Sequence, residues 1–238
     1  MTLPETESPP FVSAVPSVAF PMAPFRLSGT VYGCLMNHRP ALAALGEAAS
    51  AAPYKAAPKA PVLYVKPRNT LAGDGARVVV PADAAELELG AAVGLVIGRT
   101  ACRVREADAL SYIAGYTLVA DISVPHDSFY RPSVRFKARD GFCPIGPRVV
   151  PLVDPDALTV RVFVDGALVH ETATGDRFRS AARLLADVSD FMTLAPGDVL
   201  MLGVSHGAPR VRPGQQAGIE VDGIGRLNLH FVAEGVAA

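Results

Sequence analysis

Short apolar runs that end at glycine, proline or charged residues repeat along most of this chain. Runs of about four to eight β-prone residues bounded in this way are typical of buried strands. The 21 glycines and 21 prolines are spread along the sequence between the runs, which suits many short strands joined by turns. The runs that we interpret as strands cover residues 27–36, 62–65, 78–80, 86–98, 199–202 and 227–232.

A hairpin and three short helices complete the predicted elements. The runs 158–164 and 167–172 are separated only by Asp165-Gly166, a pair that favours the type I′ turn of a hairpin. Within 179–191 the apolar residues recur at helical spacing. The alanine-rich stretch 41–52 and the stretch 107–113 are the other two predicted helices.

One stretch, residues 112–147, carries most of the candidate chemistry. Its apolar run stops at Asp121, and an acid at the end of a buried strand lies at the mouth of a core. Pro132 and Pro144 oppose a long helix in the segment that follows. That segment places the cations Arg131, Arg135, Lys137 and Arg139 among aromatic residues. We interpret it as a partly ordered loop over a site for a carboxylate ligand. The alternative is a solvated loop with its own ion pairs.

For other polar residues near strand ends, the sequence is compatible with either a functional or a structural role. Lys66 ends a predicted strand and suggests an anion contact. His38 is either a catalytic base or ligand, or a loop histidine that caps or hydrogen-bonds. Glu86 and Glu88 share one strand face, where they would hold a divalent cation or form an outward edge. The glycine-bracketed loop 203–207 would cradle an anion with its N–H groups, although such loops are also common turns.

Length and composition limit the classes of protein. At 238 residues the chain is long enough for one large domain, and we divide it into an N-terminal arm, 1–24, and a domain, 25–238. The net charge of −1 argues against nucleic acid or an anionic membrane as a partner. The three cysteines lack CxxC spacing, and no apolar run approaches the roughly 20 residues of a membrane helix. The sequence also shows no signal peptide. Together these features predict a cytoplasmic protein. No Rossmann, P-loop or zinc motif occurs.

Several short motifs, taken together in order, resemble those of the fumarylacetoacetate hydrolase superfamily. No single motif is specific, but the ordered set is, and it covers nearly everything after about Val31. The Asn37-His38-Arg39 and Ser128-to-Pro132 segments are most similar to one branch, the bifunctional isomerase/decarboxylase of homoprotocatechuate (4-hydroxyphenylacetate) degradation. The chain resembles the N-terminal half of that protein, made as a free subunit. The motifs are Lys66-Pro67, Val96-Ile97-Gly98, Tyr112-x-x-Gly115-Tyr116-Thr117, Asp121, Lys137-x-x-Asp140-Gly141-Phe142, Pro144-x-Gly146-Pro147, Val164-Asp165-Gly166, Thr193-Leu194-x-Pro196-Gly197-Asp198 and Gly223-Ile224-Gly225-x-Leu227.

The resemblance implies a mixed, mainly β roll with a few short helices around it. It also implies a divalent metal, usually magnesium, held by Glu-x-Glu on one strand and by an aspartate that Asp121 matches. Gly90 and Ala92 stand where the glutamate pair is expected, and Glu86 and Glu88 keep that spacing four residues earlier. Four residues are about 13 Å along a strand. We therefore expect weak or absent metal in this chain alone.

The resemblance further implies where the substrate, a small tricarboxylate or dicarboxylate, is bound. Ala41 stands where active relatives carry a histidine. We expect Lys66, Lys137 and Asp121 to converge on one pocket, with a water or a lysine amine beside Asp121 in place of the metal. The implied catalytic residues are Lys66, Lys137 and Asp140, and the implied substrate-binding residues are Tyr130, Arg131, Arg139, His38 and Ser205.

Three functions are compatible with these residues. The first is a subunit of the isomerase/decarboxylase that acts on 5-carboxymethyl-2-hydroxymuconate or 5-oxopent-3-ene-1,2,5-tricarboxylate in aromatic catabolism, with a degenerate metal site. The second is a non-catalytic scaffold half that partners a metal-bearing homologue. The third is a free-standing acylpyruvase-like hydrolase. The resemblance also implies a homodimer, or assembly with the metal-bearing subunit.

Overall fold

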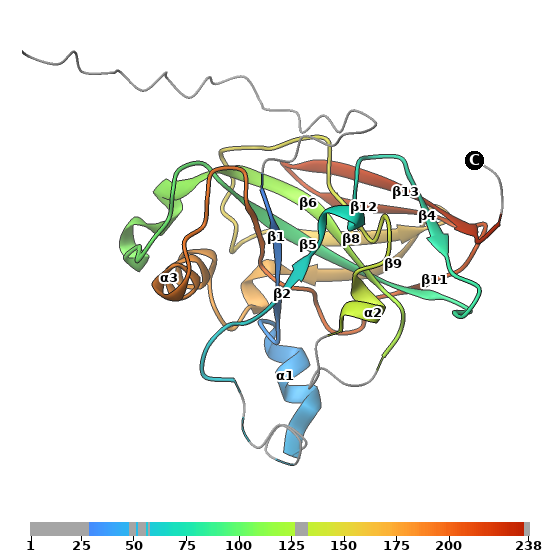
Figure 1. Ribbon diagram of the computed structural model, residues 1–238, viewed down its shortest axis with the longest axis horizontal. Helices are drawn as coiled ribbons and strands as arrows, with labels where there is room; N and C mark the ends of the chain where they lie inside the picture. The colour runs from blue at the N-terminus through green and yellow to red at the C-terminus, as the bar shows by residue number, and fades with distance from the viewer. Residues whose placement is uncertain (1–28, 48–50, 52–55, 57, 127–132, 236–238) are drawn as a thin grey trace, which may run out of the picture.

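The computed structural model describes residues 29–47, 51, 56, 58–126 and 133–235. The predicted N-terminal arm, 1–24, lies outside this range. Within it, most of the chain is organised as two β-sheets with short helices around them (Figure 1). The mixed, mainly β fold expected from the sequence is confirmed.

The first sheet holds the strands that build the candidate site. Its order is β11-β5-β10-β1-β2, and β6 pairs with β5 along the opposite edge from β10. A two-stranded parallel pair, β3 and β7, forms a small separate sheet that packs beside β6. The strands of the first sheet are β1 (Val31–Leu35), β2 (Val62–Lys66), β5 (Leu87–Ile97), β6 (Ile113–Ser123), β10 (Val199–Met201) and β11 (Arg210–Val211), and those of the small pair are β3 (Leu71–Ala72) and β7 (Cys143–Pro144).

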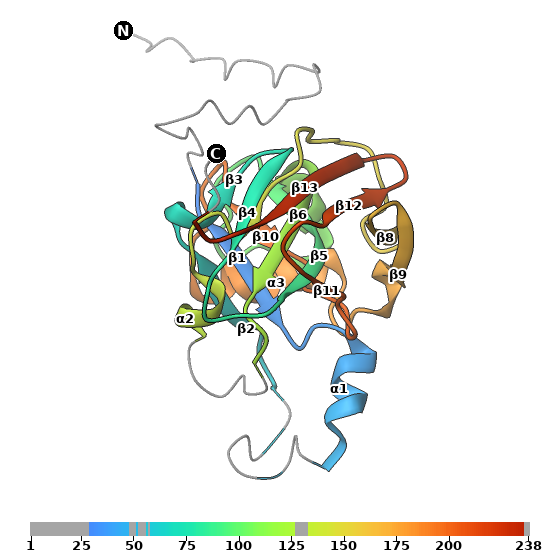
Figure 2. The ribbon, with the colours of Figure 1, turned by 90° about the vertical axis from the view of Figure 1, so that its right-hand side faces the viewer.

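The second sheet has the order β4-β13-β12-β8-β9 and lies across β5 and β6 (Figures 1 and 2). Its pairs are antiparallel except for β4 and β13, which run parallel. The sequence pattern did not predict β12, since we interpreted its surroundings only as turns. The strands are β4 (Ala76–Val80), β8 (Thr159–Val164), β9 (Ala167–Ala173), β12 (Gln216–Val221) and β13 (Gly225–Ala233).

The described residues form three α-helices around the sheets. The helix predicted for 179–191 is α3 (Ala181–Phe191), and Ser180 caps it by accepting a hydrogen bond from the Arg183 N–H. The helix predicted for 41–52 begins earlier, as α1 (Arg39–Leu45), because Pro40 suits the first turn of a helix. Figure 1 shows α1 projecting from the lower edge of the sheets. The remaining helix is α2 (Val134–Lys137), and 3₁₀ turns cover Arg68–Thr70, Glu106–Tyr112 and Thr174–Asp176.

The two-residue period of β5 and β6 divides their side chains between two clusters. Odd-numbered residues of β5 and even-numbered residues of β6 pack against the second sheet in the main core. The opposite face of the same strands contributes Ala92 and Val119 to a smaller apolar cluster with residues of β1, β7 and β10. Asp121 points to this second side, because it lies two residues beyond Val119 on the same strand. Strand alternation thus separates the core from the site.

The predicted hairpin turn is confirmed. Asp165 and Gly166 both have positive φ, 49° and 83°, as the type I′ turn requires. Replacing Gly166 by alanine should lower the free energy of unfolding by about 1 kcal/mol, since a side chain at positive φ is strained there. Gly166→Asn should cost less, because asparagine tolerates this conformation. Urea unfolding measures both, and equal stability of wild type and Gly166→Ala would contradict the turn assignment.

Candidate functional site

A cavity of about 450 Å³ opens beside Asp121, between β1, β6, α1 and the loop that follows β10. Ala41, Ala44 and Leu45 form an apolar wall on the α1 side. Its ionisable lining residues are Cys34, Tyr64, Glu88, Asp121, His126, Lys137, His206 and Arg210. The cavity therefore combines one apolar wall with many groups that can bind or move a proton.

The Asp121 carboxylate is the centre of a buried charge cluster at this cavity. Lys66 Nζ lies 2.7 Å from Oδ1, and Lys137 Nζ lies 2.8 Å from Oδ2. The Tyr64 hydroxyl also donates a hydrogen bond to Oδ2. With both lysines protonated, the cluster carries one excess positive charge. The predicted convergence on one pocket holds for Lys137 and Asp121, whereas Lys66 contacts Asp121 without lining the cavity. A lysine amine lies beside the carboxylate, as expected.

The two lysines differ in what their ammonium groups can still bind. Lys66 Nζ donates to the carbonyl oxygens of Ile122, Lys137 and Phe142, at 2.8, 3.0 and 3.0 Å. Its side chain is 0% exposed, and it is absent from the cavity lining. Lys137 has 8% of its side chain exposed and lines the cavity. Lys66 therefore fixes β2 to β6, α2 and the residue before β7, whereas Lys137 faces the cavity.

Tyr64 reaches Asp121 because β1 has a glycine beneath its ring. A Cβ placed on Gly33 would lie 1.9 Å from the Cζ atom of the Tyr64 ring, so no other residue fits at position 33 without moving the ring. Lys137 Nζ lies 4.9 Å from the centroid of the same ring, within cation–π range. The sequence interpretation did not select Tyr64; its place two residues before Lys66, on the same strand face, was the available signal.

The pKa values follow from burial and charge together. Burial alone would raise the pKa of Asp121, but the charges of Lys137 and Lys66 outweigh it and hold that pKa below its usual range. Burial lowers the pKa of Lys66, while Asp121 opposes this shift. Burial and the nearby Asp121 charge raise the pKa of Tyr64 well above its ordinary value. Tyr64 is therefore a neutral phenol, and Asp121 is a carboxylate, at neutral pH.

His126 is a second residue that the sequence interpretation did not select. Its Nδ1 lies 2.9 Å from the Val124 carbonyl oxygen, and its ring stacks on Phe136 with centroids 4.8 Å apart. A carbonyl oxygen only accepts, so Nδ1 carries the proton of this hydrogen bond. In the neutral ring, Nε2 is then the acceptor nitrogen. The ring is one of the groups that line the cavity.

The positions of the expected glutamate pair lie on the Asp121 side of the sheet but carry no oxygen. Gly90 is directly opposite Asp121, and Ala92 is opposite Val119. A Cβ on Gly90 would lie 2.8 Å from the Asp121 carbonyl oxygen and 2.9 Å from both γ-carbons of Val204. The Asp121 backbone and Val204 thus occupy the space that a longer side chain at position 90 would need.

The two acids earlier on the strand are paired with arginines. Glu86 lies 3.3 Å from Arg212, and Glu88 lies 3.4 Å from Arg210. Glu88 is opposite Ser123 and lines the cavity, two residue pairs along the strands from Asp121. In the described part of the chain, no group of three or more histidine, cysteine, aspartate or glutamate residues could hold a metal ion.

Comparison with known proteins assigns the family. The sequence profile described as Fumarylacetoacetate (FAA) hydrolase C-terminal matches residues 30–232. The chain belongs to the fumarylacetoacetate hydrolase family. It is 42% identical over 208 residues to the 4-hydroxyphenylacetate degradation bifunctional isomerase/decarboxylase of Escherichia coli. The aligned region covers 87% of this chain and 48% of that protein. The chain thus spans about half the length of the curated relatives that it matches.

Solved structures support the same fold. The 5-carboxymethyl-2-hydroxymuconate delta-isomerase of Mycobacterium smegmatis superposes with a TM-score of 0.76 at 30% identity, covering 88% of this chain and 80% of that one. Fumarylpyruvate hydrolase of Pseudomonas aeruginosa, in complex with Mn²⁺ and pyruvate, gives 0.75 at 22% identity, with coverage of 86% and 90%. The second similarity concerns the fold alone. No helix in the described ranges is long and apolar enough to cross a membrane.

The other residues that the family resemblance implied are dispersed. Asp140 is exposed and accepts a hydrogen bond from Asn69 at 2.7 Å, and Arg139 makes two 2.9 Å hydrogen bonds to Asp83. The structure therefore places neither in the cavity. Ser205 does line it, 2.8 Å from His170. Tyr130 and Arg131 lie outside the described residues.

His38 faces a different cavity from Asp121. It precedes α1, but its side chain makes no capping hydrogen bond to that helix. Instead, Nδ1 accepts from the His206 N–H at 3.0 Å. The predicted hydrogen-bonded loop histidine is confirmed by this contact, and the predicted substrate contact at the Asp121 cavity is not found.

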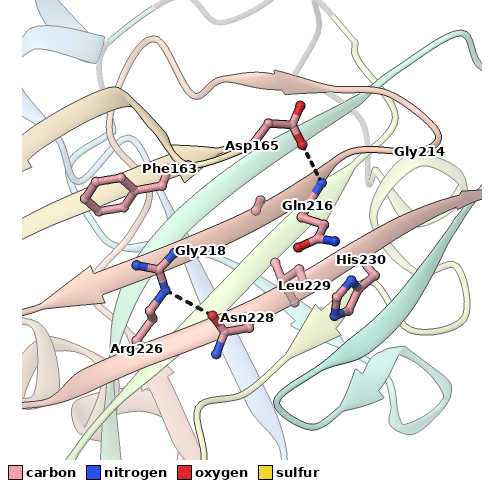
Figure 3. Close-up of a pocket in the computed structure, with 11 residues that line it drawn as sticks. Phe163, Asp165, Gly214, Gln216, Gly218, Arg226, Asn228, Leu229 and His230 are labelled. Carbon is pink, nitrogen blue, oxygen red and sulfur yellow. Dashed lines mark hydrogen bonds between the residues drawn. The ribbon is translucent and has the colours of Figure 1, made fainter.

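A third hollow, of about 390 Å³, lies over β8, β12 and β13 (Figure 3). Its charged groups already have partners: Asp165 accepts from the Gln216 N–H at 2.9 Å, and Arg226 donates to Asn228 at 3.0 Å. Arg226 also pairs with Glu220 at 3.3 Å. Figure 3 shows these groups lying along the sheet surface, so the hollow offers less free binding capacity than the Asp121 cavity.

The charge cluster makes a stability prediction. Asp121→Asn should lower the free energy of unfolding by about 3–5 kcal/mol, because it leaves two buried ammonium groups without a counter-charge. Asp83→Asn is the matched control, since Asp83 pairs with Arg139 at the surface and its loss should change stability little. Urea unfolding measures the free energy of unfolding of both variants. Equally small losses would show that the Asp121 charge is not needed to balance the two buried lysines.

Proposed function

We propose that this chain is a subunit of an isomerase/decarboxylase of aromatic catabolism and catalyses ketonisation of an enol carboxylate of the 5-carboxymethyl-2-hydroxymuconate class. The observation that carries the proposal is the pairing of Lys137 with buried Asp121 at a cavity that also holds His126. The relatives named above include an isomerase for that substrate and an isomerase/decarboxylase.

The charge of the cavity favours a carboxylate ligand. Two lysines share one aspartate, and Arg210 stands at the wall with Glu88 as its partner. Lys137 has one ion-pair contact, to Asp121, and the remaining donors of its ammonium group are available to a ligand. In a site shielded from water, such a donor stabilises the negative charge that develops on an enolate oxygen.

Ketonisation needs one proton to move and no co-reactant. The enol O–H bond breaks, its electrons shift along the conjugated chain, and a new C–H bond forms. His126 Nε2 is the proposed proton acceptor from the enol oxygen and donor to the carbon, since Nδ1 is engaged by Val124. Lys137 stabilises the dienolate between these two transfers, and Lys66 and Asp121 position Lys137.

We infer that this cavity works with a degenerate metal site. The residues around Asp121 do not fit a divalent cation: Gly90 and Ala92 supply no oxygen, and two ammonium groups lie against the carboxylate. A hard cation such as Mg²⁺ seeks several oxygen ligands and is repelled by neighbouring cations. No step of the proposed reaction is therefore assigned to a metal.

The extent of the match supports a half-subunit role. The chain covers about half of the curated isomerase/decarboxylases, whose two halves are homologous according to the family resemblance. We propose that a metal-bearing homologue carries the decarboxylation and that this chain pairs with it. The assay therefore includes the chain alone and the chain mixed with such a homologue.

Two substitutions test the proposed chemistry. Lys137→Met should lower kcat for ketonisation of 5-carboxymethyl-2-hydroxymuconate by about 10²- to 10³-fold, because it removes the donor to the enolate. His126→Gln should lower kcat by about 10²- to 10⁴-fold, because it removes the proton carrier. The reaction is followed by loss of the dienol absorbance.

Arg226→Met is the control, because Arg226 lies on the second sheet and pairs with Glu220. It should leave kcat unchanged. Absence of ketonisation by the wild type, both alone and with the homologue, would reject the proposal in favour of the scaffold function. Full activity of Lys137→Met would reject the assigned chemistry but not the reaction.

Magnesium titration tests the metal inference separately. Wild-type protein should bind Mg²⁺ weakly in calorimetry. Gly90→Glu with Ala92→Glu should gain affinity only when Val204→Ala provides room, because the γ-carbons of Val204 lie 2.9 Å from the new Cβ. We expect at least about a tenfold gain from the triple variant, since it adds two carboxylates. Tight binding by the wild type would contradict the inference.

A further inference from the structure

Two buried side chains, those of Arg177 and His38, carry nitrogen atoms that have no hydrogen-bond partner among the described residues. Both lie near the loop 203–207, which lines the Asp121 cavity. The Arg177 side chain belongs to a residue only 3% exposed, and its Nε, Nη1 and Nη2 atoms all lack partners. His38 is 4% exposed, and its Nε2 also lacks a partner. Buried polar groups are nearly always paired, so this coincidence calls for a physical cause.

The two side chains lie next to each other. His38 and Arg177 are directly opposite in an isolated antiparallel bridge. Residues in that relation project to the same side, with Cβ atoms about 5 Å apart. Arg39 strengthens the bridge by donating from Nε to the Arg177 carbonyl oxygen at 3.1 Å. The imidazole and the guanidinium can therefore share one acceptor.

Both groups present protons rather than lone pairs. The His206 N–H donates to His38 Nδ1 at 3.0 Å, so Nδ1 holds the lone pair and Nε2 carries the hydrogen of the neutral ring. Burial and the neighbouring Arg177 charge lower the pKa of His38 to about 4. The ring is then neutral at pH 7, and its Nε2–H points away from the loop contact without an acceptor.

Among the described residues, no carboxylate lies within ion-pair distance of Arg177. Burial lowers its pKa to about 10, which leaves it cationic at neutral pH. The adjacent Asp176 is exposed and forms no ion pair with it within 4 Å, although the charge of Asp176 partly opposes the lowering of the Arg177 pKa. Burial raises the pKa of the Cys34 thiol to about 11, so that thiol stays uncharged. Arg179 differs in this respect, because it is paired with Asp187 at 2.8 Å.

A cavity of about 410 Å³ lies beside His38. His38 forms part of its wall, and Arg177 lies across the bridge from His38 without lining the cavity itself. His170 and His206 also line it, and so do two carboxylates: Glu171, which pairs with Arg161 at 3.0 Å, and Asp176. A water molecule would satisfy donors here but would leave the guanidinium charge uncompensated. An anion would accept hydrogen bonds from these donors and would also balance the guanidinium charge.

We propose that Arg177 and His38 form a binding site for a small oxyanion, a carboxylate or a phosphate, separate from the Asp121 cavity. The planar guanidinium presents parallel N–H groups that match two oxygens of either anion. His38 Nε2–H supplies a further donor from the side. The site goes beyond the proposed ketonisation, since none of its residues takes part in that reaction.

Occupation of the site bears on the loop after β10. An anion that accepts from Nε2–H keeps Nδ1 as the acceptor for the His206 N–H. His206 belongs to the loop 203–207, which also contributes to the Asp121 cavity. The anion would thus hold that loop through one imidazole ring.

Calorimetric titration tests binding directly. The wild type is titrated with sodium phosphate and, separately, with sodium malonate at low ionic strength, so that the two arms distinguish the source of the oxyanion. We expect saturable one-site binding of at least one anion. Arg177→Met should weaken it at least tenfold, and Arg177→Lys should weaken it less, because lysine keeps the charge but not the fork. Arg226→Met, on the second sheet, should bind like the wild type.

Thermal unfolding supplies the second readout. The melting temperature of the wild type should rise with anion concentration, and that of Arg177→Met should not. In buffer without added oxyanion, Arg177→Met should melt no lower than the wild type, because it removes an uncompensated buried charge. A merely structural arginine would show the opposite: a lower melting temperature in that buffer and an unchanged response to anion.

Either of two results overturns the proposal. One is the absence of saturable binding of both anions to the wild type, and the other is equal anion response in wild type and Arg177→Met. Neither readout uses catalysis, so a failure of the proposed ketonisation would leave this test intact.

Discussion

A carboxylate almost fully removed from water needs a counter-charge, and the site is built around that need at Asp121. Two separate parts of the chain meet it: β2 supplies Lys66 and Tyr64, and α2 supplies Lys137. Lys66 in turn donates to carbonyl oxygens of β6 and of the residue before β7. The ion pair therefore fixes how the edge of the first sheet meets the strands beside it, and an apolar substitution at one member alone would leave a buried charge.

Strand alternation allows the same two strands to serve the core and the site. β5 and β6 give one face to the main core and the other to Asp121 and its surroundings. Missing side chains are as important there as present ones. Gly33 leaves room for the Tyr64 ring, and Gly90 leaves room for Val204. Around Asp121 the chain has tight packing and two lysines, so its own side chains balance the charge of the carboxylate.

The molecule handles its buried cations in two ways. The lysines at Asp121 and the guanidinium of Arg179 have carboxylates within 2.8 Å. Arg177 has none in the described chain, although it is equally enclosed. The loop 203–207 lies between the two regions: Ser205 lines the Asp121 cavity, and His206 lines both cavities.

Local chemistry in the sequence determined the strands, the Asp165-Gly166 turn and α3, because side-chain periodicity and turn preference act over a few neighbouring residues. The ordered motifs also indicated the family and the likeness of Asp121 to a metal ligand. They did not reveal β12, and they assigned site roles to Asp140 and Arg139, which the fold directs to Asn69 and Asp83.

Only the tertiary structure decided which of the candidate residues meet. Lys66 and Asp121 are far apart in sequence, and the difference between closed-off Lys66 and accessible Lys137 depends on carbonyl groups from other elements. The Tyr64 ring reaches the site because it lies over Gly33. The His126 ring is oriented by its hydrogen bond to the Val124 carbonyl oxygen. The isolation of Arg177 is likewise invisible in a sequence, because the absence of a partner is a property of three-dimensional packing. Sequence fixes which groups a chain carries and their local spacing, whereas burial and non-local contacts set their charge states and accessibility.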